Sequence, residues 1–224
     1  MQLEKLTKEA RRGYDDACGT AHGLELIGER WALLVLRELM LGPRRFSQLR
    51  ADLPAISANV LTQRLTELEE RGLVRRTRLP PPASVQVYEA TQWGLEAEAI
   101  VQALGRWAAR SPRHDPTLPI SGVSILLSMR TMIDSERAQK VDAHINFRFG
   151  EDLYTGHLHD GTIDISRGEH PKPDLSLAAE PQAWAAILYG KAPLDLIQWS
   201  GEQKLLETVI DLYHLPEKAP LPGH

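Results

Sequence analysis

The sequence predicts an α+β protein of two domains, the second being a mixed domain with a mainly antiparallel sheet covered by helices. The segment "SPRHDPTLP" separates two stretches with their own helix and strand patterns, and its three prolines are typical of a linker. Residues 1–114 hold 17 Lys and Arg against 14 Asp and Glu, whereas residues 115–224 hold 9 against 16. We therefore expect domains at 1–114 and 120–214 and a tail at 215–224, with any nucleic-acid contact in the first domain.

The composition narrows the class of protein. A hydrophobic content of 42% over 224 residues is that of a globular protein, and the chain has no run of about 18 apolar residues that would cross a membrane. The amino-terminal stretch is charged, so we expect a cytoplasmic protein without membrane insertion. A single cysteine excludes an internal disulfide framework and a cysteine-rich zinc site. No catalytic motif or phosphate-binding loop is evident, so we expect neither an enzyme nor a cofactor.

Helices dominate the first domain. Apolar residues at helical spacing predict a helix over residues 23–41, and a short helix should cover 47–53 with Ser47 as its cap. A third helix is expected over 57–71, followed by glycine. The β-prone runs "LVRRTR" and "VQVYEAT", joined by "LPPPAS", predict a hairpin, and a last helix should cover 92–110.

The second domain restarts with a predicted helix over residues 123–137. The alternating runs "KVDAHINFRF", "DLYTGHLHDG" and "TIDISRG" are separated by Gly-Glu-Asp and His-Asp-Gly turns, which favour antiparallel hairpins. The run "DLSLAAE" predicts a fourth strand. Two helices, "EPQAWAAILYG" and "GEQKLLETVIDLYHL", complete the chain.

The helix predicted over 57–71 has two chemically different faces. A wheel of 100° per residue gathers three leucines on one side and short polar residues on the other. The leucines are Leu61, Leu65 and Leu68, and the polar residues are Asn59, Thr62, Gln63 and Thr66, with Ser57 as the cap. Asn and Gln can pair with adenine and Thr can contact a thymine edge, so this polar face suits the major groove of DNA. Taken alone, such a face is more often merely solvated.

Arginines flank this helix on both sides. A short helix, a tight "PAI" connection, a polar-faced helix and a basic hairpin form the order of a helix-turn-helix with a wing. The arginines that we expect to neutralise phosphates are Arg44, Arg45, Arg75, Arg76 and Arg78. Each alone is more often a solvated charge, but their combination favours double-stranded DNA as the partner.

Residues 18–110 resemble the HxlR-type winged helix-turn-helix transcription regulators, which are related to the MarR group. The matching stretches are "LELIGERWALLVLRELMLGPRRFSQLR", "ISANVLTQRLTELEERGLVRR" and "YEATQWGLE". The resemblance implies that the helix from Ser57 reads DNA, that residues 75–87 form the wing, and that the terminal helices of the domain make a homodimer. Gly19 stands where the family usually has proline, and Ala90 where it usually has leucine.

A dimer is also expected on physical grounds, because one small winged helix buries too little DNA to be selective. Candidate dimer contacts are Tyr14, Leu104 and Trp107, which could alternatively complete the core of one chain.

Cys18 lies where the resembling family carries a cysteine, and it is either a redox or electrophile sensor or an inert thiol. Its neighbours Asp15 and Asp16 should raise the pKa of the thiol.

His157 and His159 alternate on one strand, as a pair of metal ligands would, with His144, Asp160 and His170 nearby in the predicted sheet. Two ligands at this spacing are a weak signal, and a solvated polar face explains them better. We therefore predict no metal site.

Residues 120–214 resemble the sterol carrier protein type 2 fold, in element order and in the region "DLSLAAEPQAWAAILYGKAPLDLIQWSGE". That fold can enclose an apolar tunnel, so a small hydrophobic ligand is a candidate partner. The residues that would line the pocket, unless they are ordinary core, are Leu126, Met129, Ile133, Trp184, Ile187, Leu188 and Leu206.

The sequence thus predicts a homodimeric, DNA-binding transcription regulator whose second domain either senses a small apolar ligand or stiffens the assembly. The alternative is a lipid or small-molecule carrier in which the winged helix serves for dimerisation or protein docking.

Overall fold

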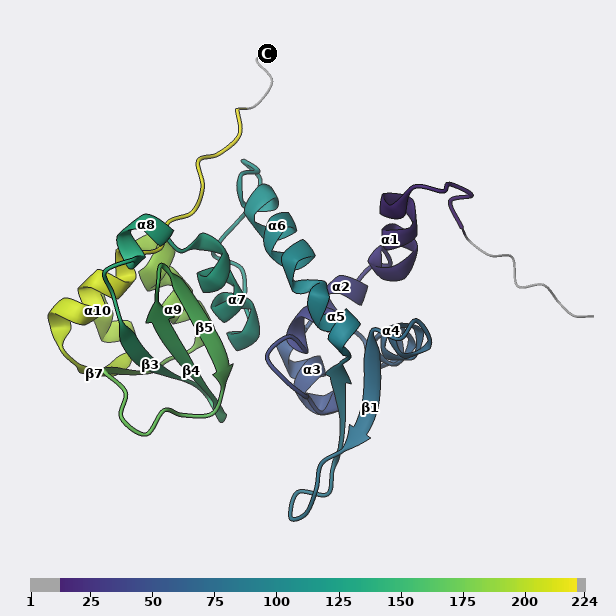
Figure 1. Cartoon of the computed structure of the whole chain (residues 1–224), viewed down its shortest axis with the longest axis horizontal. Coiled ribbons are helices and arrows are strands. Elements are labelled where there is room, and N and C mark those ends of the chain that lie inside the picture. Colours follow the sequence, from purple (N-terminus) through teal and green to yellow (C-terminus); the bar gives the residue numbers. More distant parts are fainter. Residues whose placement is uncertain (1–12, 221–224) are drawn as a thin grey trace, which may run out of the picture.

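The computed structural model describes residues 13–220, so residues 1–12 of the predicted first domain and 221–224 of the predicted tail lie outside the described residues. The chain forms two parts side by side, joined by a segment without regular structure between residues 110 and 121 (Figure 1). Within residues 13–220, no helix combines the length and the apolar character that crossing a membrane requires.

From residue 13 onward, the N-terminal part consists of six helices and one β-hairpin. Its elements are α1 (Gly19–Ile27), α2 (Ala32–Glu38), α3 (Phe46–Asp52), α4 (Ala58–Glu70), β1 (Val74–Arg78), β2 (Gln86–Ala90), α5 (Gln92–Glu96) and α6 (Glu98–Ala109). Strands β1 and β2 pair antiparallel, with Arg76 opposite Tyr88, as the hairpin prediction required. The hairpin extends away from the helices at the lower end of Figure 1.

Three helix predictions in this part were wrong in detail. The helix predicted over residues 23–41 is broken, because Trp31 has a φ angle of +77° and starts a new helical direction. The apolar spacing continues across the break, so periodicity alone does not reveal it. Ser47 is not a helix cap, since α3 begins one residue earlier and its N-cap is Arg45. The helix predicted over 92–110 is interrupted at Ala97.

The C-terminal part contains a five-stranded sheet. Its elements are α7 (Gly122–Met132), α8 (Ser135–Ala138), β3 (Ala143–Phe149), β4 (Asp152–His159), β5 (Thr162–Arg167), β6 (Leu175–Ala178), α9 (Pro181–Gly190), the 3-10 helix η1 (Leu194–Leu196), β7 (Gln198–Gly201) and α10 (Gln203–Ile210).

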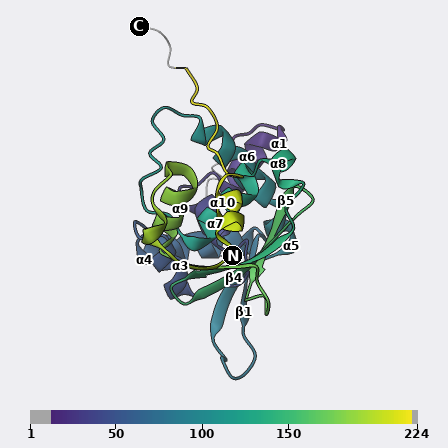
Figure 2. The same ribbon diagram turned by 90° about the vertical axis from the view of Figure 1, so that its left-hand side faces the viewer.

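The strand order is β5-β4-β3-β6-β7, and only the β3–β6 pair is parallel. The two predicted hairpins and the fourth strand are therefore confirmed. The sequence did not predict β7, and the helix predicted over 123–137 is divided, because Ile133 pairs with Tyr213 and Asp134 caps α8. Helices α7, α9 and α10 cover one face of the sheet (Figure 2).

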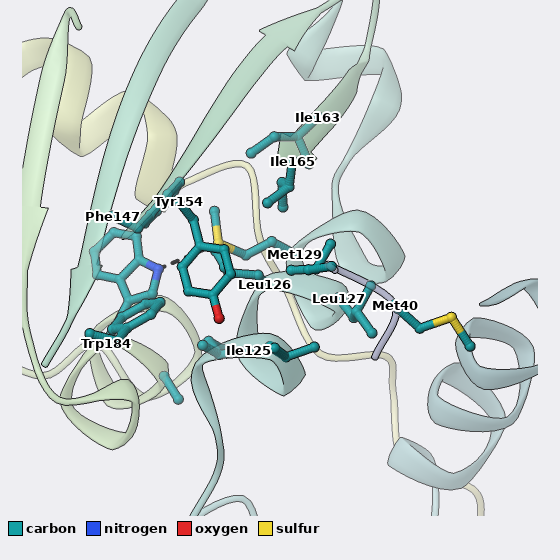
Figure 3. Close-up of a cluster of buried hydrophobic side chains, with 14 of the residues drawn as sticks. Met40, Ile125, Leu126, Leu127, Met129, Phe147, Tyr154, Ile163, Ile165 and Trp184 are labelled. Carbon is teal, nitrogen blue, oxygen red and sulfur yellow. Dashed lines mark hydrogen bonds between the residues drawn. The ribbon is translucent and has the colours of Figure 1, made fainter. Parts of the chain in front are cut away.

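The apolar core between the sheet and the helices is closely packed. Phe147, Tyr154 and Trp184 gather beside Met129 (Figure 3), and the indole Nε1 of Trp184 lies 3.4 Å from the Met129 sulfur. Six of the seven predicted pocket residues have less than 2% of their surface exposed, namely Leu126, Met129, Trp184, Ile187, Leu188 and Leu206. These six side chains fill the core, and Ile133 pairs with Tyr213, so the predicted lining of a pocket is instead packing.

The two parts are joined by a buried cluster of charges centred on Arg44, of which 2% is exposed. Its guanidinium donates to Asp52 at the end of α3 and, at 2.6 and 2.7 Å, to Asp152 at the start of β4. Arg167 of β5 also donates to Asp152, at 3.0 Å. Burial alone would raise the pKa of Asp152, but the hydrogen bonds and charges of Arg44 and Arg167 outweigh burial and lower this pKa.

Further polar contacts connect the parts. The hydroxyl of Ser121, the N-cap of α7, donates to the carboxylate of Glu38 on α2 at 2.8 and 2.9 Å. Glu38 is fully buried, and this burial raises the pKa of its carboxyl above the usual range despite the adjacent Arg37. Arg130 of α7 donates to Glu98 of α6 at 2.8 and 2.9 Å.

The Arg44 cluster should make the stability of the chain depend on Asp152. We expect Asp152→Asn to lower the free energy of unfolding at pH 7 by about 1.5–3 kcal/mol, since hydrogen bonds to a charged group are lost. Because the pKa of Asp152 is lowered in the folded chain, its contribution is present above the unfolded pKa of about 3.9 and disappears as the pH falls through the folded pKa.

The difference between wild type and Asp152→Asn should therefore shrink below about pH 4, as measured by urea unfolding across a pH series. The exposed Glu151, in the turn beside Asp152, provides a matched control, and Glu151→Gln should change little. Equal effects of the two variants at pH 7 would contradict a stabilising role of the cluster.

Candidate nucleic-acid interface

Helix α4 has the two faces that its sequence predicts. Its N-cap is Ser57, whose hydroxyl accepts from the Val60 amide at 3.3 Å. The three leucines of the apolar face are buried, and Gly72, with a φ angle of +75°, follows the end of the helix. Exposed side chains form the opposite face, which comprises Asn59, Thr62, Gln63 and Thr66.

Two of these exposed side chains have partners within the helix. Thr62 donates from its hydroxyl to the Ala58 carbonyl at 3.0 Å, and Gln63 donates from its amide to Glu67 at 2.9 Å. Both hydrogen bonds are exposed, so water or a base edge can replace them at small cost. The face therefore presents hydroxyl and amide groups, which can form hydrogen bonds with the edges of DNA bases.

The orientation of α4 depends on arginines that the sequence analysis did not single out. Arg64 lies on α4 but is buried, and its guanidinium is 2.7 Å from Glu67 and 3.4 Å from Glu29. Arg71, at the end of α4, donates to the Leu26 carbonyl at 2.7 Å. The spacing of three residues between Arg64 and Glu67 was the one available signal. These contacts fix α4 against the corner between α1 and α2.

The hairpin carries three exposed arginines. Arg75 lies 2.8 Å from Glu89, and Arg76 lies 3.5 Å from Glu69 and stacks over Tyr88 at 5.3 Å. Arg78 donates to the Ser84 carbonyl at 2.9 Å. Exposed ion pairs of this kind contribute little stability, so these guanidinium groups can exchange their partners for phosphates.

Arg44 and Arg45 were predicted to act alike, and the structure separates them. Arg45 is exposed at the start of α3. The guanidinium of Arg44 is enclosed by Asp52 and Asp152, and its backbone pairs with Tyr88 of β2. The prediction that Arg44 contacts phosphate is therefore wrong, because its donors face the two carboxylates inside the molecule.

The candidate dimer residues are all on the surface. Trp107 is 72% exposed, Tyr14 60% and Leu104 46%. Ile100, one turn before Leu104 on α6, and Leu24 on α1 are exposed as well and were not predicted. A continuous strip of exposed apolar side chains on α6 is unusual for a surface that faces only water.

Cys18 is exposed and is the N-cap of α1. Hydrogen bonds from the backbone of Thr20 and Ala21, and from the side chain of Thr20, lower the pKa of the thiol. The expectation that Asp15 and Asp16 raise this pKa is therefore wrong. The amides at the start of the helix and the Thr20 side chain stabilise the thiolate and set the direction of the shift.

The histidines of the sheet share the face that the helices leave open. The ring of His144 stacks on His157 at 4.1 Å and on His170 at 3.8 Å. His157 and His159 have carboxylate partners, Asp142 at 3.0 Å and Asp164 at 2.9 Å. Among the described residues, no group of three or more His, Cys, Asp and Glu side chains is arranged to hold a metal ion.

The helix pair α3 and α4, followed by a basic hairpin, defines a helix-turn-helix protein of the DNA-binding class. Residues 26–115 match the family model of the HxlR-like helix-turn-helix. The transcriptional regulator YodB of Bacillus subtilis (strain 168) is 37% identical over 83 residues, which are 37% of this chain and 74% of YodB. The HTH-type transcriptional regulator YkvN of the same organism is 39% identical over 94 residues, which are 41% of this chain and 77% of YkvN.

The solved structure of reduced YodB from B. subtilis is 32% identical and covers 45% of this chain and 100% of that chain, with a TM-score of 0.40. The chain belongs to the HxlR-like helix-turn-helix family of transcription regulators. The family match ends at residue 115, before the first strand of the larger sheet.

The lowered pKa of the Cys18 thiol can be tested by alkylation. Alkylation by iodoacetamide should reach half its maximal rate at a lower pH in the folded protein than in the same protein unfolded in urea, because the helix amides act only in the fold. Thr20→Ala should move this midpoint part of the way back, since it removes the side-chain hydrogen bond and keeps the backbone ones. A folded midpoint at or above the unfolded midpoint would contradict the lowered pKa.

Proposed function

We propose that the protein is a homodimeric regulator that reads specific DNA sequences with the exposed face of α4. The observation that carries this proposal is the division of α4 into a leucine face held in the core and a face of Asn, Thr and Gln side chains open to solvent. In the major groove, Asn59 and Gln63 would pair with bases. Thr62, Thr66 and Ser57 would make the shorter contacts at the start and centre of the helix.

The phosphates on either side of the groove would be bound by arginines outside α4. Arg75, Arg76 and Arg78 of the hairpin and Arg45 of α3 are exposed, which supports this role. Each phosphate contact releases counterions, so these residues would contribute affinity and salt dependence without sequence preference.

The exposed apolar strip on α6 supports a dimer made through Trp107 and Leu104, and the exposed Tyr14 of the amino-terminal region is a further candidate contact. A two-fold dimer would place two copies of α4 in successive major grooves, about 34 Å apart. Cys18 would then be one exposed thiol per subunit, with a lowered pKa, available to oxidants or electrophiles.

The second domain would either respond to a ligand and thereby change the dimer, or make the dimer more rigid. A five-stranded sheet with three helices on one face supports its resemblance to the sterol carrier protein type 2 fold. The rival function, a carrier with an apolar tunnel, has less support, because the residues predicted to line that tunnel are packed core.

Selection of bound DNA from a random pool tests this function, because it reports binding, sequence preference and half-site spacing together. We expect Asn59→Ala to weaken binding to the selected site by about 1–3 kcal/mol and to relax preference at particular base pairs. Arg76→Ala should weaken binding to all sequences and reduce the slope of log K against log salt by about 1.

Arg148 provides a matched control, since it is an exposed arginine on the sheet, paired with Glu169, away from α4. Arg148→Ala should leave the affinity and the salt slope unchanged. A pool that yields no preferred sequence, or equal losses for Arg76→Ala and Arg148→Ala, would contradict this function.

Association of the subunits is tested by Trp107→Ala. A central interface tryptophan typically contributes about 2 kcal/mol or more, so the dimer dissociation constant should rise by roughly 30-fold or more in sedimentation equilibrium. Leu196, exposed on η1, serves as the control, and Leu196→Ala should not change association. If Trp107→Ala lowers the free energy of unfolding but leaves the dissociation constant unchanged, Trp107 belongs to the core of one chain instead.

A further inference from the structure

A cavity of about 630 Å³ lies at the junction of the two parts, outside the packed core of the sheet domain. Its walls come from α2, α6, the segment 114–120, α7 and α9, and Leu215 also lines it. Helix α6 stands between α2 and α7 in Figure 1, so the cavity is bounded on one side by the DNA-binding part. The volume is within the range of small-molecule sites, about 300–1,000 Å³.

The wall of the cavity is largely apolar and carries one partly buried polar pair, and its charged or titratable lining residues are Arg37, His114 and Asp115. The hydroxyls of Ser128 on α7 and Tyr189 on α9 are 2.7 Å apart. Burial raises the pKa of Tyr189 to about 12, so its hydroxyl is uncharged near neutral pH. The charged side chains of the lining already have hydrogen-bond partners, since Arg37 of α2 donates to Glu38 at 2.6 Å and Asp115 accepts from the Thr117 hydroxyl at 2.6 Å. This lining suits an uncharged ligand that is mostly apolar and has one hydrogen-bonding group.

Helix α6 presents its small residues to the cavity. Gly105 and Ala108 line it, and a Cβ atom added at Gly105 would meet no other heavy atom within 4 Å. The space beside Gly105 is therefore open to a bound molecule or to a larger side chain.

The same helix forms the exposed apolar strip. Ile100 and Trp107 lie on its outer side, Val101 and Ala108 on its cavity side, and Leu104 at the border between them. The end of α6 is tied to the second part, since the Ala219 amide donates to the Arg110 carbonyl at 2.7 Å and Lys218 donates to the Ala109 carbonyl at 3.0 Å. A molecule in the cavity would press on the helix that we assign to the dimer.

We propose that this junction cavity binds an uncharged, mainly apolar small molecule with one hydroxyl, carbonyl or amine group directed at Ser128 and Tyr189, and that its occupancy sets the position of α6. The regulatory half of this proposal rests on the proposed function. A ligand changes the affinity for DNA only if it binds one spacing of the dimer's two recognition helices more tightly than another. Movement of α6 would change this spacing.

The binding half is tested without DNA by titrating the full chain with N-phenyl-1-naphthylamine, a neutral apolar fluorophore with one N–H group. We expect saturable binding of one molecule per chain. Gly105→Leu should weaken it by at least about tenfold, because the leucine occupies the cavity, whereas Gly105→Ala should retain it. Tyr189→Phe, a conservative change, should weaken it roughly 2- to 12-fold through loss of a hydrogen bond.

Trp107→Ala distinguishes the cavity from the exposed strip and should retain binding of the fluorophore. Absence of saturable binding, or equal binding by wild type and Gly105→Leu, would overturn the site. If binding is instead lost in Trp107→Ala, the fluorophore binds the outer side of α6 and the cavity is not the site.

The regulatory half is measured separately, as the affinity for the selected DNA with and without saturating fluorophore. A shift in wild type that is absent in Gly105→Leu supports regulation, whereas saturable binding without any shift overturns it. Failure to select a preferred DNA sequence counts against the proposed function and leaves the binding result intact.

Discussion

The placement of the second domain depends on Arg44, a cation removed from water at the boundary of the two parts. Burying a guanidinium is costly unless carboxylates compensate its charge. Asp52 supplies one of them from α3 and Asp152 supplies the other from β4. The backbone of Arg44 also pairs with Tyr88 of the hairpin. Arg44 therefore connects the short helix, the hairpin and the sheet domain, and loss of either carboxylate would leave part of a buried charge uncompensated.

Much of the fold follows from local patterns in the sequence. The hairpins around Gly150 and Gly161 were predictable, because alternation of apolar residues and turn chemistry both act over a few neighbours. The break at Trp31 was not, since a residue without the freedom of glycine adopts a positive φ there and the apolar spacing hides the change. Strand β7 is four residues long, and it is defined by pairing with β6 rather than by its own pattern.

In the candidate site, too, features that arise from local periodicity were predictable and features that depend on distant contacts were not. The faces of α4 were predictable, because they arise from 3.6-residue periodicity within thirteen residues. Arg44 and Arg45 are indistinguishable in the sequence, and what separates them is a carboxylate 108 residues further along the chain. The residues that were predicted to line a pocket are a related case. Apolar residues at core spacing predict burial, but whether they leave a space depends on how distant elements meet, and the space here lies where α6 meets α7 and α9.

The contacts between the two parts also place unlike net charges at opposite sides of the molecule. Residues 115–224 carry 16 acidic against 9 basic residues, and the Arg44 cluster fixes this half beside α3. A polyanion approaching the molecule would be repelled over the sheet domain and attracted over the hairpin. Repulsion by the acidic half would thus restrict the directions from which a duplex can approach. This restriction would be strongest at low ionic strength.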